Sequence, residues 1–74
     1  MIVNTEPTDV IRKYLLSELA KGHRYFRAKH IAEEVGLSRK VVGVRLGHME
    51  RDGEKLMVVS KFADKVWRIE PIET

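Results

Sequence analysis

The chain has 74 residues, no cysteine and a net charge of +3. This length predicts one domain with a small core, and the lack of cysteine excludes a disulfide framework and a thiolate metal site. No apolar run approaches the roughly 20 residues of a membrane-spanning helix, and no signal peptide is evident. We therefore expect a soluble, cytoplasmic protein with no membrane partner.

The positive charge is concentrated in the middle of the chain. Residues 21–48 contain seven basic and two acidic residues, a net of +5, whereas the remainder contains seven basic and nine acidic residues, a net of −2. A one-sided positive field favours a polyanionic partner. The alternative interpretation is a set of ordinary solvated lysines and arginines.

The first predicted helix begins near Thr5 or Thr8, either of which can cap it, and continues to Lys21 before Gly22. Residues 1–5 are expected to form a short tail or a pairing strand. The spacing i, i+4, i+8 predicts one buried face: Ile11, Leu15 and Leu19. This face is widened by three further apolar residues: Val10, Tyr14 and Leu16. Such a wide apolar face indicates either that the helix lies at the centre of the core or that part of it contacts a second subunit.

The middle of the chain predicts a short strand and a short helix. Tyr25 and Phe26 are expected to extend as the strand and to fill the core, with base stacking as the alternative. The segment "AKHIAEEV", residues 28–35, predicts a helix that Gly36 ends. Leu37 and Ser38 then form a turn.

A third helix is predicted from Arg39 to about Asp52, with Ser38 as its N-cap. At 100° per residue, one group of side chains faces inward: Val42, Leu46 and Met49. The opposite side carries Lys40, Val44, Gly47 and Arg51, flanked by Gly43 and His48.

Beyond Gly53 the pattern changes to that of a β-hairpin. The segments "KLMVVS" and "KVWRIE", residues 55–60 and 65–70, have strand composition around the break "KFAD". The break lacks an Asn-Gly or Asp-Gly signal, so we expect a loop of about four residues. Pro71 should end the second strand, and residues 71–74 should form a tail. The predicted fold is α+β: three helices, a short strand and a C-terminal β-hairpin.

The segment "AKHIAEEVGLSRKVVGVRLGHMERDG" resembles the core of winged helix-turn-helix proteins, as found in small bacterial and archaeal transcription regulators. The resemblance covers roughly residues 8–70. It implies that the third helix enters the DNA major groove, with these groove-facing positions: Ser38, Arg39, Lys40, Gly43, Val44 and Gly47. It further implies backbone contacts by the wing residues Lys61 and Lys65 and phosphate contacts by Arg27 and Lys29. Many relatives carry polar residues where this chain has Gly43, Val44 and Gly47.

The residue chemistry is compatible with this expectation. Arg39 and Lys40 can reach phosphate or guanine edges, and Val44 can meet a thymine methyl group. Gly43 and Gly47 allow close approach of a surface, which is either nucleic acid or a second helix.

Catalytic and metal-binding patterns are absent from the sequence, so we expect no enzyme activity, no cofactor, no metal and no small-molecule ligand. The leading hypothesis is a transcriptional regulator that binds double-stranded DNA, with a homodimer reading two half-sites as a plausible arrangement. The alternatives are a protein-interaction module and an RNA-binding component of a ribonucleoprotein.

Overall fold

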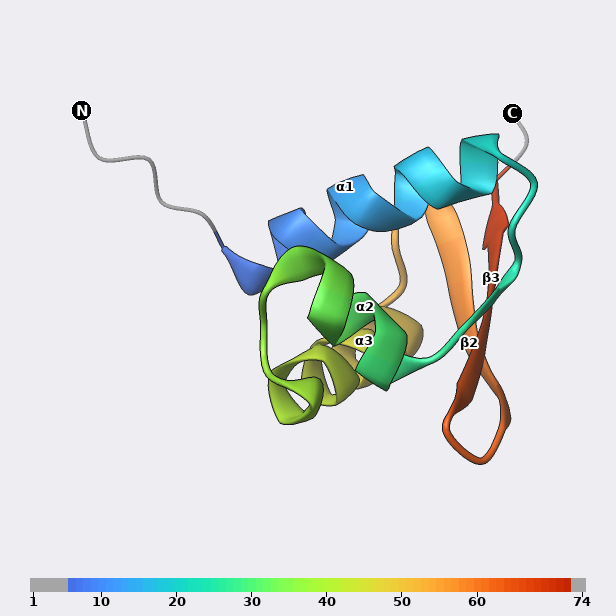
Figure 1. Ribbon diagram of the computed structural model, residues 1–74. Helices are drawn as coiled ribbons and strands as arrows, with labels where there is room; N and C mark the ends of the chain where they lie inside the picture. The colour runs from blue at the N-terminus through green and yellow to red at the C-terminus, as the bar shows by residue number, and fades with distance from the viewer. Residues whose placement is uncertain (1–5, 73–74) are drawn as a thin grey trace.

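The computed structural model describes residues 6–72. These residues form three helices and three strands in the order α1 (Pro7–Ala20), β1 (Tyr25–Phe26), α2 (Ala28–Val35), α3 (Arg39–Asp52), β2 (Met57–Ala63) and β3 (Val66–Pro71) (Figure 1). The layout is the predicted winged helix-turn-helix. The predictions for residues 1–5 and 73–74 lie outside the described residues. Strand β3 ends at Pro71, as predicted, and Ile72 N–H donates to the carbonyl of Leu56 just beyond it.

The helix α1 has the predicted core face but a different start. Its N-cap position is Glu6, which makes no side-chain capping bond, and Pro7 occupies the first turn. Thr8 lies inside the helix and is therefore not a cap. The predicted face is buried, and its flanking residues Tyr14 and Leu16 are half-buried against the same core. Tyr14 and Leu16 therefore take part in the packing of this chain.

The helix-turn-helix is built as the sequence predicts. α2 ends at Gly36, whose φ of 75° is the left-handed conformation that glycine adopts without strain. Ser38 then caps α3, because its Oγ accepts a hydrogen bond from Val41 N–H at 3.1 Å. The inward residues of α3, Val42, Leu46 and Met49, are buried.

The three strands form an antiparallel sheet in the order β1-β3-β2. Along β2 and β3, alternate residues point toward the helices and are buried: Met57, Val59, Trp67 and Ile69. They complete a core to which all three helices and β1 contribute. Figure 1 shows α1 running above α2 and α3, with the β2–β3 hairpin, the wing, extending downward beside them.

The wing has a tighter turn than the predicted four-residue loop, so that prediction was wrong. Strand β2 continues through Ala63, and Asp64 and Lys65 alone form the turn before Val66. A register shift between Lys61 and Ala63 makes this possible, since it accommodates an extra residue in β2. Lys65 adopts a φ of 65°, a conformation that is uncommon for residues other than glycine.

The prediction that both Tyr25 and Phe26 fill the core was half wrong. Phe26 is buried, but Tyr25 is 55% exposed because successive residues of a strand point to opposite faces. The Tyr25 ring instead packs edge-on against Phe62 of the wing, with 5.1 Å between ring centroids. Phe62 nevertheless stays 60% exposed.

An ion pair ties α1 to the segment that leads into the wing. The guanidinium of Arg12 donates to both carboxylate oxygens of Glu54, at 2.5 and 3.2 Å. The Glu54 side chain is only 11% exposed, so the pair is partly shielded from water. The hydrogen bond from Arg12 to Glu54 is the main cause that raises the pKa of Arg12 above its ordinary value.

We predict that Ser38→Ala lowers the free energy of unfolding by about 1 kcal/mol, because α3 loses its side-chain cap. The matched control is Ser17→Ala, which removes the same hydroxyl from an exposed position inside α1 and should leave stability unchanged or slightly higher. Denaturant unfolding measures both. Equal effects of the two substitutions would contradict the assigned cap.

Candidate nucleic-acid interface

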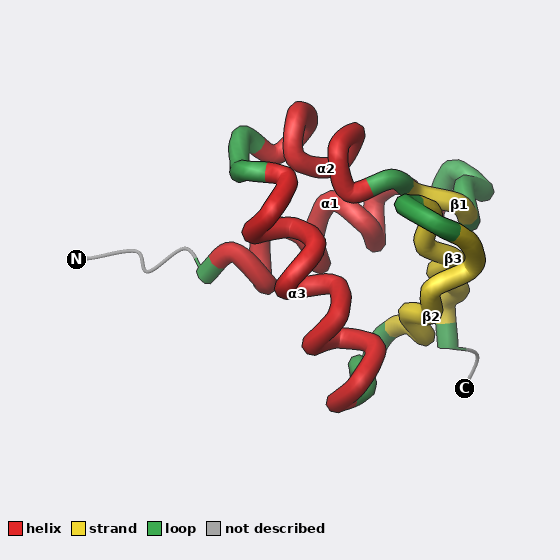
Figure 2. The backbone as a smooth tube through the Cα atoms, turned by 90° about the horizontal axis from the view of Figure 1, so that it is seen from below, coloured by secondary structure: helices red, strands yellow, loops and turns green. Residues whose placement is uncertain are grey.

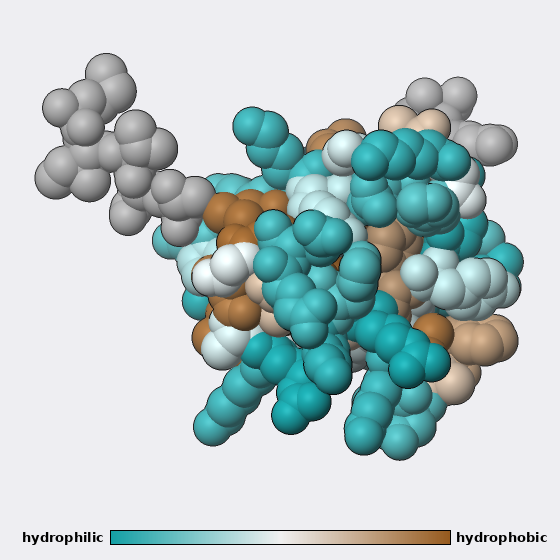
Figure 3. Space-filling view, in the orientation of Figure 1, coloured by the Kyte–Doolittle hydropathy of each residue, from teal (hydrophilic) through white to brown (hydrophobic). Residues whose placement is uncertain are grey.

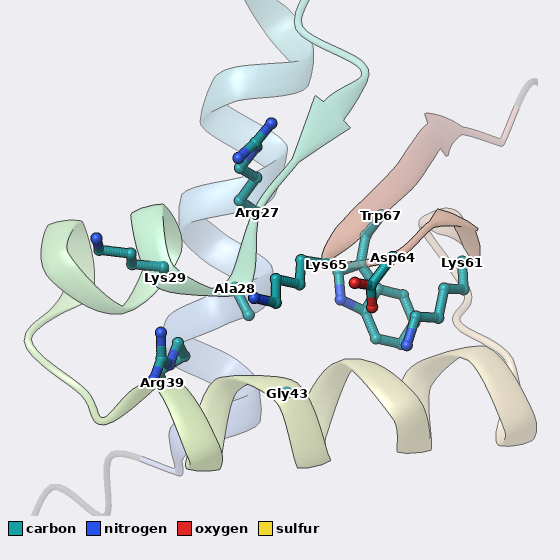
Figure 4. Close-up of a pocket in the computed structure, with 9 residues that line it drawn as sticks. All are labelled: Arg27, Ala28, Lys29, Arg39, Gly43, Lys61, Asp64, Lys65 and Trp67. Atoms are coloured by element: carbon teal, nitrogen blue, oxygen red, sulfur yellow. The ribbon is translucent and has the colours of Figure 1, made fainter.

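A hollow of about 590 Å³ lies between the beginning of α2, the N-terminal half of α3 and the wing. Figure 2, which views the molecule from below, shows α3 and the sheet flanking this region. The residues lining the hollow are drawn in Figure 4: Arg27, Ala28, Lys29, Arg39, Gly43, Lys61, Asp64, Lys65 and Trp67. Five of them are basic, and they come from the beginning of α2, the first turn of α3 and the wing.

The basic side chains approach the hollow from different sides. Lys65 extends from the wing turn toward the beginning of α2, and Arg39 rises from the first turn of α3 (Figure 4). Lys61 crosses below the ring of Trp67, with its Nζ 5.6 Å from the ring centroid. Arg27 lines the rim and its guanidinium group is turned away from α3. The wing and the start of α3 therefore direct positive charge toward this space, whereas the ammonium group of Lys29, like the guanidinium of Arg27, points outward from it (Figure 4).

In the part of the chain that the structure describes, these lining cations have no neutralising partner. Among residues 6–72, none of the five forms an ion pair, and neither does Lys40. Elsewhere the pattern is mixed. Arg12, Lys21 and Arg68 pair with carboxylates, whereas among residues 6–72 no ion pair is formed by the following: Lys13, Arg24, Arg45 and Lys55. Asp64 is the one carboxylate among the lining residues. The hollow therefore has a surplus of positive charge that suits an anion.

The outward side of α3 continues this surface beyond the hollow. Lys40 is exposed, Val44 is 48% exposed, and Gly43 and Gly47 are half-buried. Ser38 is also exposed, although its Oγ is already engaged as the cap of α3. In Figure 3, long hydrophilic side chains extend from the lower side of the molecule, where α3 and the wing tip lie in Figure 1.

Packing within the described residues does not require the two glycines of α3. A Cβ atom built at Gly43 or Gly47 meets no atom of another residue within 4 Å beyond the local helix. Each glycine nevertheless costs about 1 kcal/mol relative to alanine in a helix interior. At these two positions α3 therefore has no side-chain bulk, and an external molecule can approach its backbone closely.

The far end of α3 contributes less free charge. Arg51 Nε donates to the Asp52 carboxylate at 3.1 Å, and this bond is the main cause that holds the pKa of Asp52 below its ordinary value. Among the described residues, the unpaired cations of α3 therefore lie nearer its beginning, where free backbone N–H groups add partial positive charge.

Two residues of this region were not identified as interface residues from the sequence. Trp67 is 7% exposed and lines the hollow beside the Lys61 ammonium group. Glu50, in the last turn of α3, accepts a hydrogen bond from Lys61 N–H at 2.9 Å. This contact joins α3 to β2 and so orients the wing relative to the helix. Its residues are eleven positions apart, and no local spacing rule indicates it.

The sequence matches the family described as Domain of unknown function (DUF7123) over residues 3–71, so the chain belongs to that family. Searches of curated proteins and of solved structures gave no match. Within residues 6–72, no helix is long and apolar enough to span a membrane. The same residues contain no cluster of three histidine or carboxylate side chains arranged to hold a metal ion.

We predict that Glu50→Ala loosens the wing without unfolding the domain, because it removes the acceptor of the Lys61 amide. Loss of one such bond, about 1 kcal/mol, should make the Lys61 amide exchange its proton about fivefold faster. Amide hydrogen exchange followed by NMR measures the rate. Glu50→Gln keeps a side-chain carbonyl acceptor and should preserve most of the protection. An unchanged rate in Glu50→Ala would show that this bond does not hold the wing.

Proposed function

We propose that this member of the DUF7123 family binds double-stranded DNA, with α3 in the major groove and the wing along the adjacent backbone. The observation that carries the proposal is the hollow, where five basic residues from three elements gather without an internal ion-pair partner among residues 6–72. Such a surface matches the regularly spaced phosphates of a duplex.

Phosphate binding is supported at the beginning of α3. Arg39 and Lys40 are exposed in its first turn, where the unpaired N–H groups of a helix N-terminus favour a negative charge. Contacts to phosphate position a protein on the duplex without reading its sequence. These residues would therefore set the depth and register of α3 in the groove.

The shape of α3 also supports the proposal. B-DNA has a major groove about 12 Å wide, which admits a helix. Gly43 and Gly47 leave the outward side of α3 without bulky groups, so the helix backbone can approach the base edges. Packing within the domain does not require glycine at these positions. Close approach of an external partner would explain their presence more simply than domain stability does.

The wing would contact the DNA backbone beside the groove. Lys61 and Lys65 face the hollow, and Glu50 holds β2 in place relative to α3. The turn places a lysine at a φ of 65°, although glycine would adopt that conformation with less strain. A side-chain contribution of Lys65 to binding would explain why a lysine occupies this position.

The biological role that we propose is transcriptional regulation in the cytoplasm, by occupation of a DNA site and without catalysis. A single small domain makes few base contacts, so a homodimer on two half-sites would extend the recognised sequence. Structured RNA and a protein partner are the other binding candidates, and the binding experiment below includes RNA as a competitor.

Replacement of the interface cations should weaken DNA binding. We predict that Arg39→Ala, Lys40→Ala, Lys61→Ala and Lys65→Ala each lower the affinity for duplex DNA at low salt. Each substitution should also reduce the slope of log affinity against log salt by about one, since each removes one phosphate contact. Fluorescence anisotropy with a labelled duplex across a salt series measures both quantities.

The matched control for these variants is Lys13→Ala, which removes the same charge from an exposed position on α1. It should keep the salt slope of the unmodified protein. Absence of duplex binding at micromolar protein would contradict the proposal, as would equal losses in Lys13→Ala and the interface variants. Stronger competition by structured RNA than by duplex DNA would favour the RNA alternative.

The glycines provide a test in which stability and binding should change in opposite directions. We predict that Gly47→Ala raises the free energy of unfolding by up to about 1 kcal/mol, because alanine is the better helix former and open space surrounds the position. The added methyl group should nevertheless weaken duplex binding by holding α3 away from the groove. Thermal unfolding and anisotropy measure the two effects. Undiminished binding by the stabilised variant would show that α3 does not approach DNA at Gly47.

A further inference from the structure

The centre of the outward side of α3 carries an apolar side chain framed by positive charge. Val44 is 48% exposed, Lys40 lies one turn before it, and the neighbouring Gly43 lines the basic hollow. Isolated exposed valines are common on protein surfaces and need no explanation. This one differs in its position, because it occupies the middle of the surface that the proposed function places in the major groove.

The hydrogen-bonding capacity at this position is small. Val44 has no polar side-chain atom, and Gly43 and Gly47 have no side chain. Their backbone groups lie within the helix, in the hydrogen-bonded interior of Arg39–Asp52. Direct readout of guanine or adenine requires donors or acceptors at the base edge, so this part of α3 is poorly suited to it.

An apolar group in the major groove has one chemical counterpart. The C5 methyl group of thymine projects into this groove, and cytosine methylated at C5 presents the same group. Removal of such a methyl group and of the facing valine methyl groups from water would stabilise the complex. The open space at Gly43 and Gly47 allows α3 to come close enough for this contact, and the surrounding cations favour the duplex as the occupant.

We propose that Val44 recognises the C5 methyl group of pyrimidines in the major groove, whether the base is thymine or 5-methylcytosine. This inference rests on the proposed function and specifies what α3 recognises. It predicts preference for methyl-bearing pyrimidines at the positions that face Val44, without a requirement for a particular hydrogen-bonding pattern there.

The test compares duplexes that differ only in C5 methyl groups. Two duplexes of roughly 20 base pairs, about two helical turns, carry alternating A·T pairs, and one of them has deoxyuridine in place of every thymidine. This replacement preserves every hydrogen-bonding group in the groove. The unmodified protein should bind the thymine duplex about fourfold more tightly for each methyl group in contact with Val44. A G·C duplex with and without C5-methylated cytosine should give the same direction.

The substitution Val44→Ala connects this preference to the side chain. The variant should bind the thymine and uracil duplexes about equally, and it should fold normally because the site is on the surface of a helix and alanine favours helix. The matched control is Val58→Ala, which trims another exposed valine, in β2, and should keep the preference.

The outcomes separate the two proposals. Equal binding of thymine and uracil duplexes by the unmodified protein would overturn methyl recognition and leave DNA binding intact. A preference that persists in Val44→Ala would also overturn it, because the cause would then be duplex shape rather than contact with Val44. Failure to bind any duplex would overturn both the inference and the proposed function.

Discussion

The position of the wing depends on the inward face of the β-hairpin. Met57 and Ile69 are fully buried in the core that the helices form, and Trp67 is nearly so. Because strand residues alternate between faces, burial of these side chains determines which residues of β2 and β3 point outward. A slip of one residue would bury polar side chains and move the wing relative to α3. The hollow therefore exists because the core specifies this register.

The periodic parts of the molecule could be predicted from the sequence. The buried residues of α1 and α3 recur at helical spacing, and Ser38 and Gly36 are residues with a physical reason to begin and end helices. The irregular parts of the molecule were harder to predict from the sequence. A strand of two residues does not show which side faces inward, so the side chain of Tyr25 was wrongly placed in the core. The turn was missed because Lys65 adopts a left-handed backbone conformation that is rare for lysine.

The basic residues of the candidate site could be predicted from the sequence, but the hollow that they line could not. Basic residues near the beginning of α2, on α3 and on the wing were identified from the sequence, and the structure brings Arg27, Lys29, Arg39, Lys61 and Lys65 around one hollow. The roles of Trp67 and Glu50 depend on contacts between separate elements, and no local pattern specifies such contacts. The sequence indicates that a tryptophan in a strand belongs to the core. Only the register of the sheet shows that Trp67 also lines the site.

The concentration of charge around the hollow has a cost in stability. A domain of 74 residues is marginally stable, and cations that share one hollow repel one another. Among residues 6–72, Lys61 and Lys65 have no ion-pair partner that would offset this repulsion, and the same is true of Lys13 and Lys55 outside the hollow. The glycines of α3 lower stability in the same region without a packing benefit. Both features reduce stability at one surface, which is expected where binding to a partner supplies the compensating free energy.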